Sequence, residues 1–349
     1  RRSCSLVNGE SILFHDKGDL LYLLITEGRS HFTEATNASR TMIYDIQKNE
    51  WSDELLNLFD IPKSILPEVK NSADNFGTTS LFGDEISIGG IAGDQQAATI
   101  GQACFDPGSV KSTYGTGCFM LMNTGENLRI SQNNLLTTIA YRINGETCYA
   151  LEGSIFIAGA AIQWLRDSLK VIKSAEETEE LYSQSDPSQQ IYLVPAFVGL
   201  GAPYWEGDAR GSLFGMTRNT GIPELVKAAI DSIAYQTKDL IIAMEKDSEL
   251  KISRLKVDGG MVKNEKFLQF LSDILITTCD RPVITETTAL GAGYLSALQS
   301  GIIKNLNEIE AKWKSDKTFE PKLHKKEVKY LYNLWLKAVK GTLAVKNES

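Results

Sequence analysis

Three glycine-containing segments follow short apolar stretches of this chain, and their order constrains the fold more than any other feature. The segments are Gly93–Gln96, Ser112–Gly117 and Asp258–Gly260. Each follows residues typical of a buried strand, and the first and third lead into helical patterns. Strands that alternate with helices predict an α/β fold.

The elements around these segments are predicted from hydrophobic periodicity and turn signals. Strands are expected at 86–92, 110–113, 119–123, 135–140, 147–151, 191–194 and 255–257. Asn144-Gly145 predicts a type I′ turn between two of them. Helices are expected at 94–103, 155–169, 175–183, 223–245, 265–277, 289–300 and 327–345, with short helices and turns at 51–58 and 62–69 and a compact apolar stretch at 20–25.

Asp106-Pro107-Gly108 interrupts the regular pattern and is the expected domain boundary. A chain of 349 residues suits about two domains. We therefore expect one domain at 1–105 and a second at 106–349.

The charge balance argues against a nucleic-acid-binding surface. Lys and Arg total 36 against 44 Asp and Glu, for a net charge of −8, whereas nucleic-acid binding usually requires a basic excess. The basic run at 312–317 is interpreted as a solvated helix end because acidic residues surround it. The five cysteines and three histidines form no zinc or redox motif, so a reducing, cytoplasmic setting is expected. No apolar run reaches the roughly 20 residues of a membrane span.

Asp94 suits phosphoryl transfer. That reaction needs phosphates held by backbone N–H groups, a cation, and a carboxylate that deprotonates the acceptor hydroxyl. Asp94 begins a predicted helix, where a carboxylate stays ionised and can face Mg²⁺. The alternative is that Asp94 only caps the helix, and its position alone favours the cap.

The other two segments suit an anion. Gly115 and Gly117 flank Thr116, which lets the backbone approach a phosphate and adds a hydroxyl, although an ordinary glycine hairpin fits equally well. Gly259 and Gly260 would suit close approach of an adenosine or its phosphates.

Two further sets of residues are ambiguous when taken alone. Asn264 by itself fits a helix N-cap better than a ligand contact. Gly159 and Gln163 share a helix face, which suggests helix packing as readily as ligand contact.

Taken together, these segments resemble the glycerol kinases of the FGGY carbohydrate kinase family. The resemblance extends over roughly residues 27–339 and is densest at 36–42, 90–98, 112–125, 150–156, 163–167, 194–197, 199–205 and 257–260. It implies the actin-like ATPase (ribonuclease H-like) fold. The first, substrate-side domain would be incomplete at 1–105, and the second, nucleotide-side domain would be complete at 106–349.

The resemblance also implies roles for single residues. Asp94 would be the catalytic base and a neighbour of Mg²⁺, and Gln95 and Phe119 would line a glycerol pocket. Two groups of residues would bind the nucleotide. The phosphates would contact Gly115, Thr116 and Gly117. The rest of ATP would contact Gly159, Gln163, Gly259, Gly260 and Asn264.

The implied activity is ATP-dependent phosphorylation of glycerol to sn-glycerol 3-phosphate, by a cytoplasmic enzyme that forms a homo-oligomer at full length. Two alternatives are a non-catalytic nucleotide-binding fragment and a kinase of the same family for another polyol or sugar.

The chain departs from the family pattern at three places. The family's N-terminal portion, with its first phosphate hairpin, has no counterpart, so the chain alone is expected to be catalytically impaired. The stretch 1–19 matches poorly, and 15–19 replaces a glycine-threonine turn. The segment 79–86 has no arginine, so feedback by a sugar bisphosphate is expected to be absent.

Overall fold

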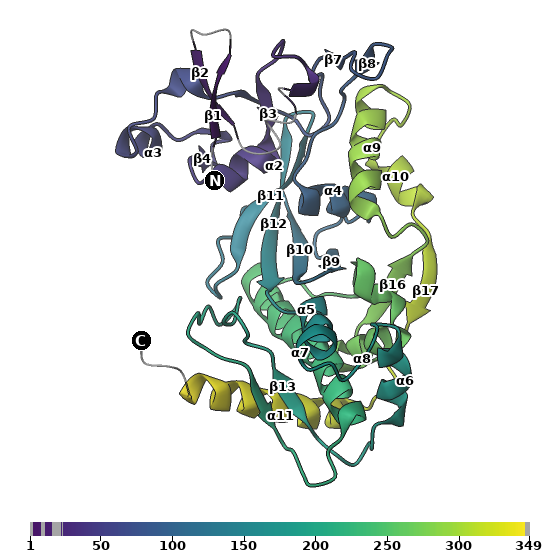
Figure 1. Cartoon of the computed structure of the whole chain (residues 1–349). Helices are drawn as coiled ribbons and strands as arrows, with labels where there is room; N and C mark the ends of the chain where they lie inside the picture. Colours follow the sequence, from purple (N-terminus) through teal and green to yellow (C-terminus); the bar gives the residue numbers. More distant parts are fainter. Residues whose placement is uncertain (1–2, 8–10, 16–21, 23, 346–349) are drawn as a thin grey trace.

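A seven-stranded sheet organises the molecule. The structure, a computed structural model, describes residues 3–7, 11–15, 22 and 24–345 (Figure 1). The sheet has the order β11-β12-β10-β9-β15-β16-β17. Its strands are β9 (Val110–Tyr114), β10 (Cys118–Gly125), β11 (Leu136–Ile143), β12 (Glu146–Ile155), β15 (Arg254–Asp258), β16 (Thr278–Pro282) and β17 (Ser315–Phe319). β15 is parallel to both β9 and β16, and the other pairs are antiparallel. The predicted α/β class is confirmed.

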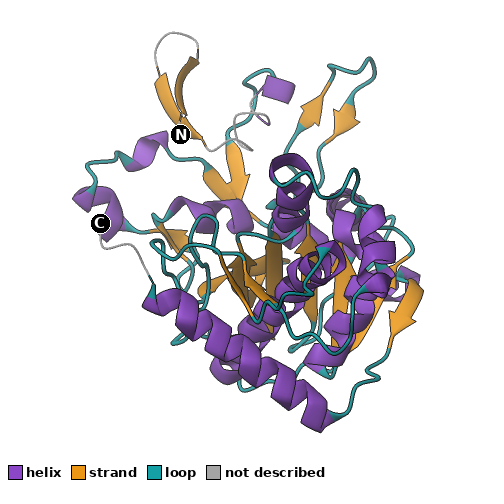
Figure 2. Ribbon diagram, turned by 60° about the horizontal axis from the view of Figure 1, so that its bottom comes forward, coloured by secondary structure: helices purple, strands orange, loops and turns teal. Residues whose placement is uncertain are grey.

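Helices cover both faces of this sheet (Figures 1 and 2). On one side lie α4 (Asp94–Gly101), α9 (Thr287–Gln299) and α10 (Leu306–Lys312). The other side carries α5 (Gly159–Gln163), which continues as a π-helix at Trp164–Ser168, together with α6 (Glu177–Gln184), α7 (Ile222–Ser248), α8 (Glu265–Leu275) and α11 (Lys325–Ala344).

Alternate residues of β10 build the two cores. Met120 and Met122 join the large cluster that contains α7 and α8, whereas Leu121 joins Ile100 and Leu295 in the cluster under α4 and α9. Side chains of a strand point alternately to opposite faces, so one apolar strand supplies both layers.

The segment before α4 is made of short elements. They are β1 (Ser3–Val7), β2 (Ser11–His15), β3 (Phe32–Glu34), α2 (Ala35–Ala38), β4 (Tyr44–Asp45), β5 (Glu50–Trp51), α3 (Asp53–Leu58), β6 (Glu68–Lys70), β7 (Thr78–Thr79) and β8 (Ile86–Ser87), with 3₁₀ turns at Ser39–Thr41 and Lys63–Ile65. Its own apolar cluster packs against Ile139 and Tyr149 of the sheet. β13 (Tyr192–Val194) pairs with β14 (Ser212–Phe214), and a 3₁₀ turn at Gly260–Lys263 precedes α8. The domain boundary at 106–108 stays a prediction.

Most predicted elements are present, including the type I′ turn. Asn144 and Gly145 both have positive φ, 53° and 82°, as that turn requires. The helix expected from 51 begins instead at Asp53, because Ser52 caps it by accepting a hydrogen bond from the Leu55 amide. Of the stretch 20–25, residues 20, 21 and 23 lie outside the described residues, as do 16–19 of the poorly matching start.

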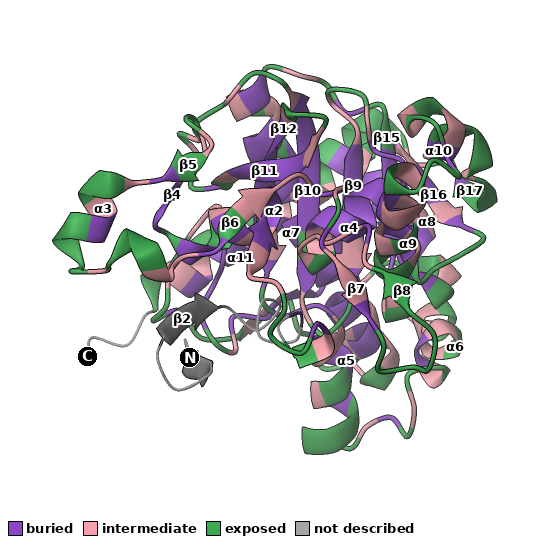
Figure 3. Cartoon of the chain, turned by 90° about the horizontal axis from the view of Figure 1, so that it is seen from above, coloured by how far each residue is buried: buried purple, intermediate pink, exposed green. Residues whose placement is uncertain are grey.

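The buried strand expected at 86–92 is wrong. Within this segment strand β8 contains only Ile86 and Ser87, and both are exposed in a hairpin with β7 (Figure 3). The following glycines lie against α9 rather than in the sheet. A Cβ on Gly90 would come within 2.7 Å of the Leu295 Cβ atom. Beyond β8 the backbone forms an isolated antiparallel bridge between Gly90 and Ala73, so the segment pairs with its own neighbour in the chain and packs on α9 instead of entering the large sheet.

The helix expected at 155–169 begins four residues late. β12 continues to Ile155, and α5 starts at Gly159. Ile155 is β-branched, which suits a strand, and it still pairs with Cys118 of β10. Among the described residues, no helix combines the length and apolar character needed to cross a bilayer.

Candidate active site

Asp94 is the first residue of α4 and projects an exposed carboxylate. Gly93 occupies the N-cap position, and no side chain caps the helix. The carboxylate of Asp94 instead accepts hydrogen bonds from Gln95, from its backbone N–H at 2.7 Å and from its side-chain amide at 3.2 Å. Asp94 is therefore not the N-cap residue, although its carboxylate accepts one N–H of the first turn, and its role as the base stays a prediction.

A buried network fixes the turn that carries Asp94. The Thr36 hydroxyl accepts a hydrogen bond from the Gly93 N–H at 2.8 Å and donates to the Glu34 carboxylate. Glu34 has no exposed surface, and it also accepts from the Asn37 N–H at 2.7 Å and the Ser72 hydroxyl at 3.1 Å. Burial raises the pKa of the Glu34 carboxyl. Residues far earlier in the chain thus position Asp94.

Lys111 of β9 binds the side chain of Gln95. This lysine is completely buried, and its ammonium donates to the Gln95 side-chain oxygen and to the Thr113 hydroxyl, the latter at 3.1 Å. Burial lowers the pKa of Lys111, and the negative charge of Asp258 opposes that shift. A buried cation needs such partners because desolvation is costly. Sequence reasoning missed Lys111, whose only signal is a charge inside an apolar strand.

Asp258 itself is buried at the end of β15. It accepts hydrogen bonds from the Gln102 amide at 2.8 Å and from the Thr287 hydroxyl. Gln102 in turn accepts from the Trp313 indole N–H at 3.0 Å. Asp258 therefore joins the ends of α4, α9 and α10 to the sheet rather than facing open space.

Phe119 lies beside this cluster. It pairs with Thr113 across β9 and β10, and 42% of its surface is exposed. Directly opposite residues of an antiparallel pair share one face of the sheet. Asp94, Gln95 and Phe119 are thus connected through Lys111 and Thr113.

A second part of the site is a cavity of about 390 Å³ beyond the end of β9. Six predicted nucleotide residues line it, and they come from the β9–β10 turn, α5 and the turn after β15: Gly115, Thr116, Gly159, Gln163, Gly260 and Asn264. A volume of this order suits a small-molecule ligand.

The glycines of the cavity permit close backbone approach. The Gly159 N–H donates to the Gly115 carbonyl at 2.9 Å, and a Cβ on Gly159 would lie 2.6 Å from that oxygen. At Gly260 an added Cβ would meet nothing within 4 Å, so this position faces open space.

Gly117 and Gly259 do not line the cavity. A Cβ on Gly117 would lie 2.6 Å from the Ile155 carbonyl oxygen. Gly259 has φ of 92°, and its Cβ would lie 2.4 Å from the Tyr114 carbonyl oxygen. Their visible role is to let the turns pack against neighbouring backbone.

Asn264 has two functions in the fold. Its side-chain oxygen caps α8 by accepting from the Phe267 N–H at 2.9 Å, as expected for an N-cap. Its amide donates to the Thr178 hydroxyl at 3.1 Å, which ties α6 to α8 beside the cavity. The lining also contains Arg166 and Lys263, two cations that sequence reasoning did not select.

The two parts of the site meet at the end of β9. Thr113 lies in β9, and Thr116 lies in the bend that follows the strand, where the Gly115 N–H donates to the Gly117 carbonyl at 2.9 Å. Thr113 contacts Lys111 of the Asp94 cluster, whereas Tyr114, Gly115 and Thr116 line the cavity.

Comparison with known proteins adds a family relationship. Residues 10–101 match the model of the N-terminal domain of the FGGY family of carbohydrate kinases, and residues 110–300 match that of the C-terminal domain. The chain is 57% identical to a glycerol kinase of Sinorhizobium fredii over 323 residues, which is 91% of this chain and 65% of that protein. It is 54% identical to a glycerol kinase of Chelativorans sp., covering 95% of this chain and 69% of that protein.

Solved structures agree. The crystal structure of Plasmodium falciparum glycerol kinase with ADP superposes with a TM-score of 0.89 at 38% identity, over 95% of this chain and 67% of that one. A ligand-bound xylulose kinase from Lactobacillus acidophilus superposes with a TM-score of 0.82 at 22% identity, over 94% and 67% of the two chains, and at that identity shows the fold alone. The chain spans 65% of the length of the first of the curated relatives.

Proposed function

Since the chain belongs to the FGGY family of carbohydrate kinases, we propose that it transfers the γ-phosphoryl group of ATP to glycerol, forming sn-glycerol 3-phosphate and ADP. The family's structural neighbours also confirm the actin-like ATPase fold expected from the sequence. The observation that carries the proposal is the connection of an exposed carboxylate, Asp94, to a ligand-sized cavity through the single strand β9.

In the proposed reaction, Asp94 acts as the general base. Its carboxylate takes the proton of a terminal glycerol hydroxyl while that oxygen bonds to the γ-phosphorus. The bond from phosphorus to the β,γ-bridging oxygen breaks, and ADP leaves with its electron pair. A general base must lie within hydrogen-bonding reach of the proton, and the exposed position of Asp94 permits this.

The neighbours of Asp94 would orient the acceptor. Gln95 is held by Asp94 on one side and by Lys111 on the other, so its amide has a fixed direction. The exposed ring of Phe119 would cover the carbon side of glycerol. Fixed groups around a small alcohol favour a reactive geometry, which accounts for much of catalysis in phosphoryl transfer.

The donors present suit Mg²⁺ delivered with the nucleotide. Within the described residues, no group of three or more His, Cys, Asp or Glu is arranged to hold a metal ion. Mg²⁺ in kinases is commonly held by one or two carboxylates together with phosphate oxygens and waters, so Asp94 alone is an adequate protein ligand. When bound, the ion would neutralise charge developing on the phosphates.

The experiment is a coupled assay of ATP-dependent glycerol 3-phosphate formation. It uses the 349-residue chain alone and the chain mixed with an N-terminal fragment of the Sinorhizobium fredii glycerol kinase. The variant Asp94→Asn keeps the shape of the side chain and removes the base, so we expect turnover to fall at least about 100-fold with ADP binding retained. Unchanged turnover in this variant would contradict the assignment of the base.

A second candidate is a nucleotide-binding protein without kinase activity. The observation that favours it is that the cavity is formed within residues 114–264, whereas the chain spans 65% of the first relative. ADP binding without turnover in either format would support this candidate. A panel of other polyols and sugars in the same assay tests a different acceptor.

A further inference from the structure

The backbone of residues 91–93, which leads into Asp94, is held by two hydrogen bonds. The Ile91 N–H donates to the Ser72 carbonyl at 3.1 Å, and the Gly93 N–H donates to the Thr36 hydroxyl at 2.8 Å. Since Asp94 follows directly, these bonds determine where its own backbone starts. Both acceptors belong to residues that also bind Glu34.

The Glu34 carboxylate joins the two acceptor residues. Its Oε1 atom accepts from the Thr36 hydroxyl, and its Oε2 atom accepts from the Ser72 hydroxyl at 3.1 Å. Glu34, Thr36 and Ser72, here called the Glu34 network, have no exposed surface. Hydrogen bonds shielded from water in this way are electrostatically stronger than exposed ones.

Capping of α2 accounts for only part of this arrangement. Glu34 is the N-cap residue of α2 and accepts from the Thr36 N–H at 2.8 Å and from the Asn37 N–H at 2.7 Å. A cap needs no more than such backbone bonds, and the shorter Asp, Asn and Ser are preferred for it. The bonds from the Thr36 and Ser72 hydroxyls are additional, and both lead to the turn before Asp94.

Ser72 also attaches the Glu34 network to the large sheet. Its N–H donates to the carbonyl of Arg142 in β11 at 2.7 Å, and its hydroxyl accepts from the Arg142 N–H at 3.2 Å. The same sheet carries Lys111 and Phe119. The network therefore fixes the start of α4 relative to the other residues of the candidate active site.

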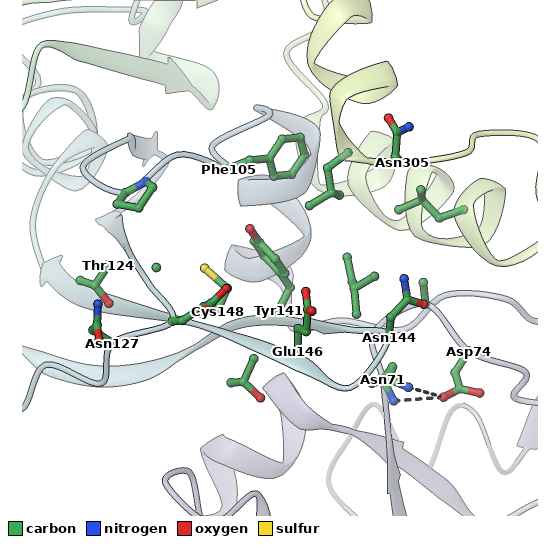
Figure 4. Close-up of a pocket in the computed structure, with 18 of the residues that line it drawn as sticks. Asn71, Asp74, Phe105, Thr124, Asn127, Tyr141, Asn144, Glu146, Cys148 and Asn305 are labelled. Carbon is green, nitrogen blue, oxygen red and sulfur yellow. Dashed lines mark hydrogen bonds between the residues drawn. The ribbon is translucent and has the colours of Figure 1, made fainter.

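The turn that contains Ser72 is itself held in place. The Asn71 side chain donates to the Asp74 carboxylate at 3.0 Å and accepts from the Gly145 N–H at 3.0 Å (Figure 4). The first bond closes the turn, and the second ties it to the connection between β11 and β12. The support beneath residues 91–93 is thus preformed.

We propose that Glu34 and Thr36 are positioning residues for phosphoryl transfer, which act by holding the turn that presents Asp94. The inference rests on the proposed function, because it takes Asp94 as the base. A small displacement of a reacting group can lower the rate about 100-fold. Nucleotide affinity should be spared, since neither residue lines the nucleotide cavity.

A pair of substitutions at Thr36 tests the role in turnover. Thr36→Val removes the hydroxyl and keeps the shape of the side chain, whereas Thr36→Ser keeps the hydroxyl and removes the methyl group. In the coupled assay we expect Thr36→Val to lower kcat about ten- to 100-fold, with ADP affinity unchanged. Thr36→Ser should restore most of the lost rate. Thr342→Val, at a buried threonine of α11 that donates to the Ala338 carbonyl, is the matched control and should leave kcat unchanged.

Hydrogen exchange followed by mass spectrometry tests the positioning without turnover. In Thr36→Val the Gly93 N–H loses its acceptor, so exchange in the peptide that covers residues 91–95 should rise about three- to tenfold, the effect of one hydrogen bond. Thr36→Ser and Thr342→Val should exchange there like the unaltered chain. Glu34→Gln places an amide donor among N–H and hydroxyl donors and should raise exchange in the same peptide.

Several outcomes contradict the proposal. Unchanged exchange at residues 91–95 in Thr36→Val would show that the hydroxyl does not hold the turn. Increased exchange with unchanged kcat would show that the turn does not govern catalysis. Equal losses of kcat in the valine and serine variants, or a parallel loss of ADP affinity, would indicate a general packing defect. If the unaltered chain has no turnover with or without the N-terminal fragment, the proposed function fails and the kinetic role fails with it, whereas exchange still decides whether Thr36 holds the turn.

Discussion

The buried environment of Lys111 suggests a role that can be tested. Its ammonium is buried between Gln95 and Thr113, so it holds the side chain beside the proposed base without meeting substrate. Lys111 is thus a positioning residue. Its effect should appear in the chemical step and not in nucleotide affinity.

We expect Lys111→Met to lower kcat for glycerol phosphorylation about ten- to 100-fold. The affinity for ADP should stay within about twofold, because Lys111 does not line the nucleotide cavity. Steady-state kinetics combined with ADP titration separates the two effects, and Lys337→Met at an exposed position is the matched control. Equal losses in kcat and ADP affinity would indicate a general structural defect.

Asp239 gives a second prediction, on stability. This carboxyl is buried beneath α11, where it accepts from the Tyr332 hydroxyl and from the Trp335 indole at 2.9 Å. Burial raises its pKa from 3.8 to about 6. Between these values the folded chain keeps a proton that the unfolded chain has lost, so stability falls as pH rises through that window. The total change is roughly 3 kcal/mol.

The variant Asp239→Asn should lose this part of the pH dependence. Urea unfolding at several pH values from 4 to 7 measures it, relative to the exposed Asp84→Asn as control. If both variants show the same slope as the unaltered chain, Asp239 does not titrate in this range.

At the scale of elements, α4 and α9 cross with their backbones in close contact. A Cβ on Gly101 would lie 2.0 Å from the Thr287 carbonyl oxygen, and one on Gly291 would lie 1.8 Å from that of Ala97. The helices therefore touch backbone to backbone. Only glycine allows this separation at the two positions.

Gly291→Ala should consequently destabilise the chain by about 1–3 kcal/mol, because the helices must move apart. Gly293 is the control on the same helix, since a Cβ there meets nothing within 4 Å. Gly293→Ala should instead stabilise by up to about 1 kcal/mol through helix propensity. Thermal unfolding of both variants tests the contrast, and a Gly291→Ala protein as stable as the original would disprove the close crossing.

The sequence patterns predicted the existence of helices and strands more accurately than the residues at which they begin. The long amphipathic helix near 223–245 and the strand before Asp258 need only local periodicity, and both are present. The segment 86–92 has strand composition, but Gly90 is held by α9, which lies two hundred residues later. The segment pairs with residues 72–79, and its packing on a distant helix could not be predicted from local composition.

The site, like the fold, was predicted in part. The glycines and Asp94 could be selected from the sequence because their residue types suit phosphate binding and catalysis. Most of the predicted nucleotide residues line one cavity. The contacts from Thr36 to Gly93 and from Lys111 to Gln95 join separate parts of the chain. No spacing in the sequence reveals such pairs.

At the scale of the whole molecule, the nucleotide cavity is built from one continuous region, residues 114–264. We therefore expect the 349-residue chain to bind ADP whether or not it catalyses phosphorylation. A concentration of 100 times the Kd should stabilise it by about 2.7 kcal/mol. Differential scanning fluorimetry with and without ADP measures this shift.

Gly260 offers the variant that tests the location. A Cβ at this position would meet nothing within 4 Å, and Gly260 lines the cavity. Gly260→Leu should therefore fill the cavity and abolish the ADP-dependent rise in unfolding temperature. The unfolding temperature without ADP should stay within a few degrees of that of the unaltered chain. Gly260→Ala is the smaller control and should retain part of the shift. Undiminished stabilisation by ADP in Gly260→Leu would place the nucleotide elsewhere.

The backbone contact between α4 and α9 has one more consequence, for motion. Interlocked side chains at a helix crossing resist rotation because each angle requires a different packing, whereas two smooth glycine surfaces offer few such obstacles. Asp94 begins α4, and Gly101, which touches α9, ends it. α9 also contacts the first half of α4, because the Thr288 hydroxyl donates to the Asp94 carbonyl at 3.4 Å and Gly291 packs on the Ala97 carbonyl. A small shift of α9 would thus carry α4 with it and move the carboxylate relative to the sheet. The same two glycines that make the chain intolerant of substitution would make it compliant in one direction.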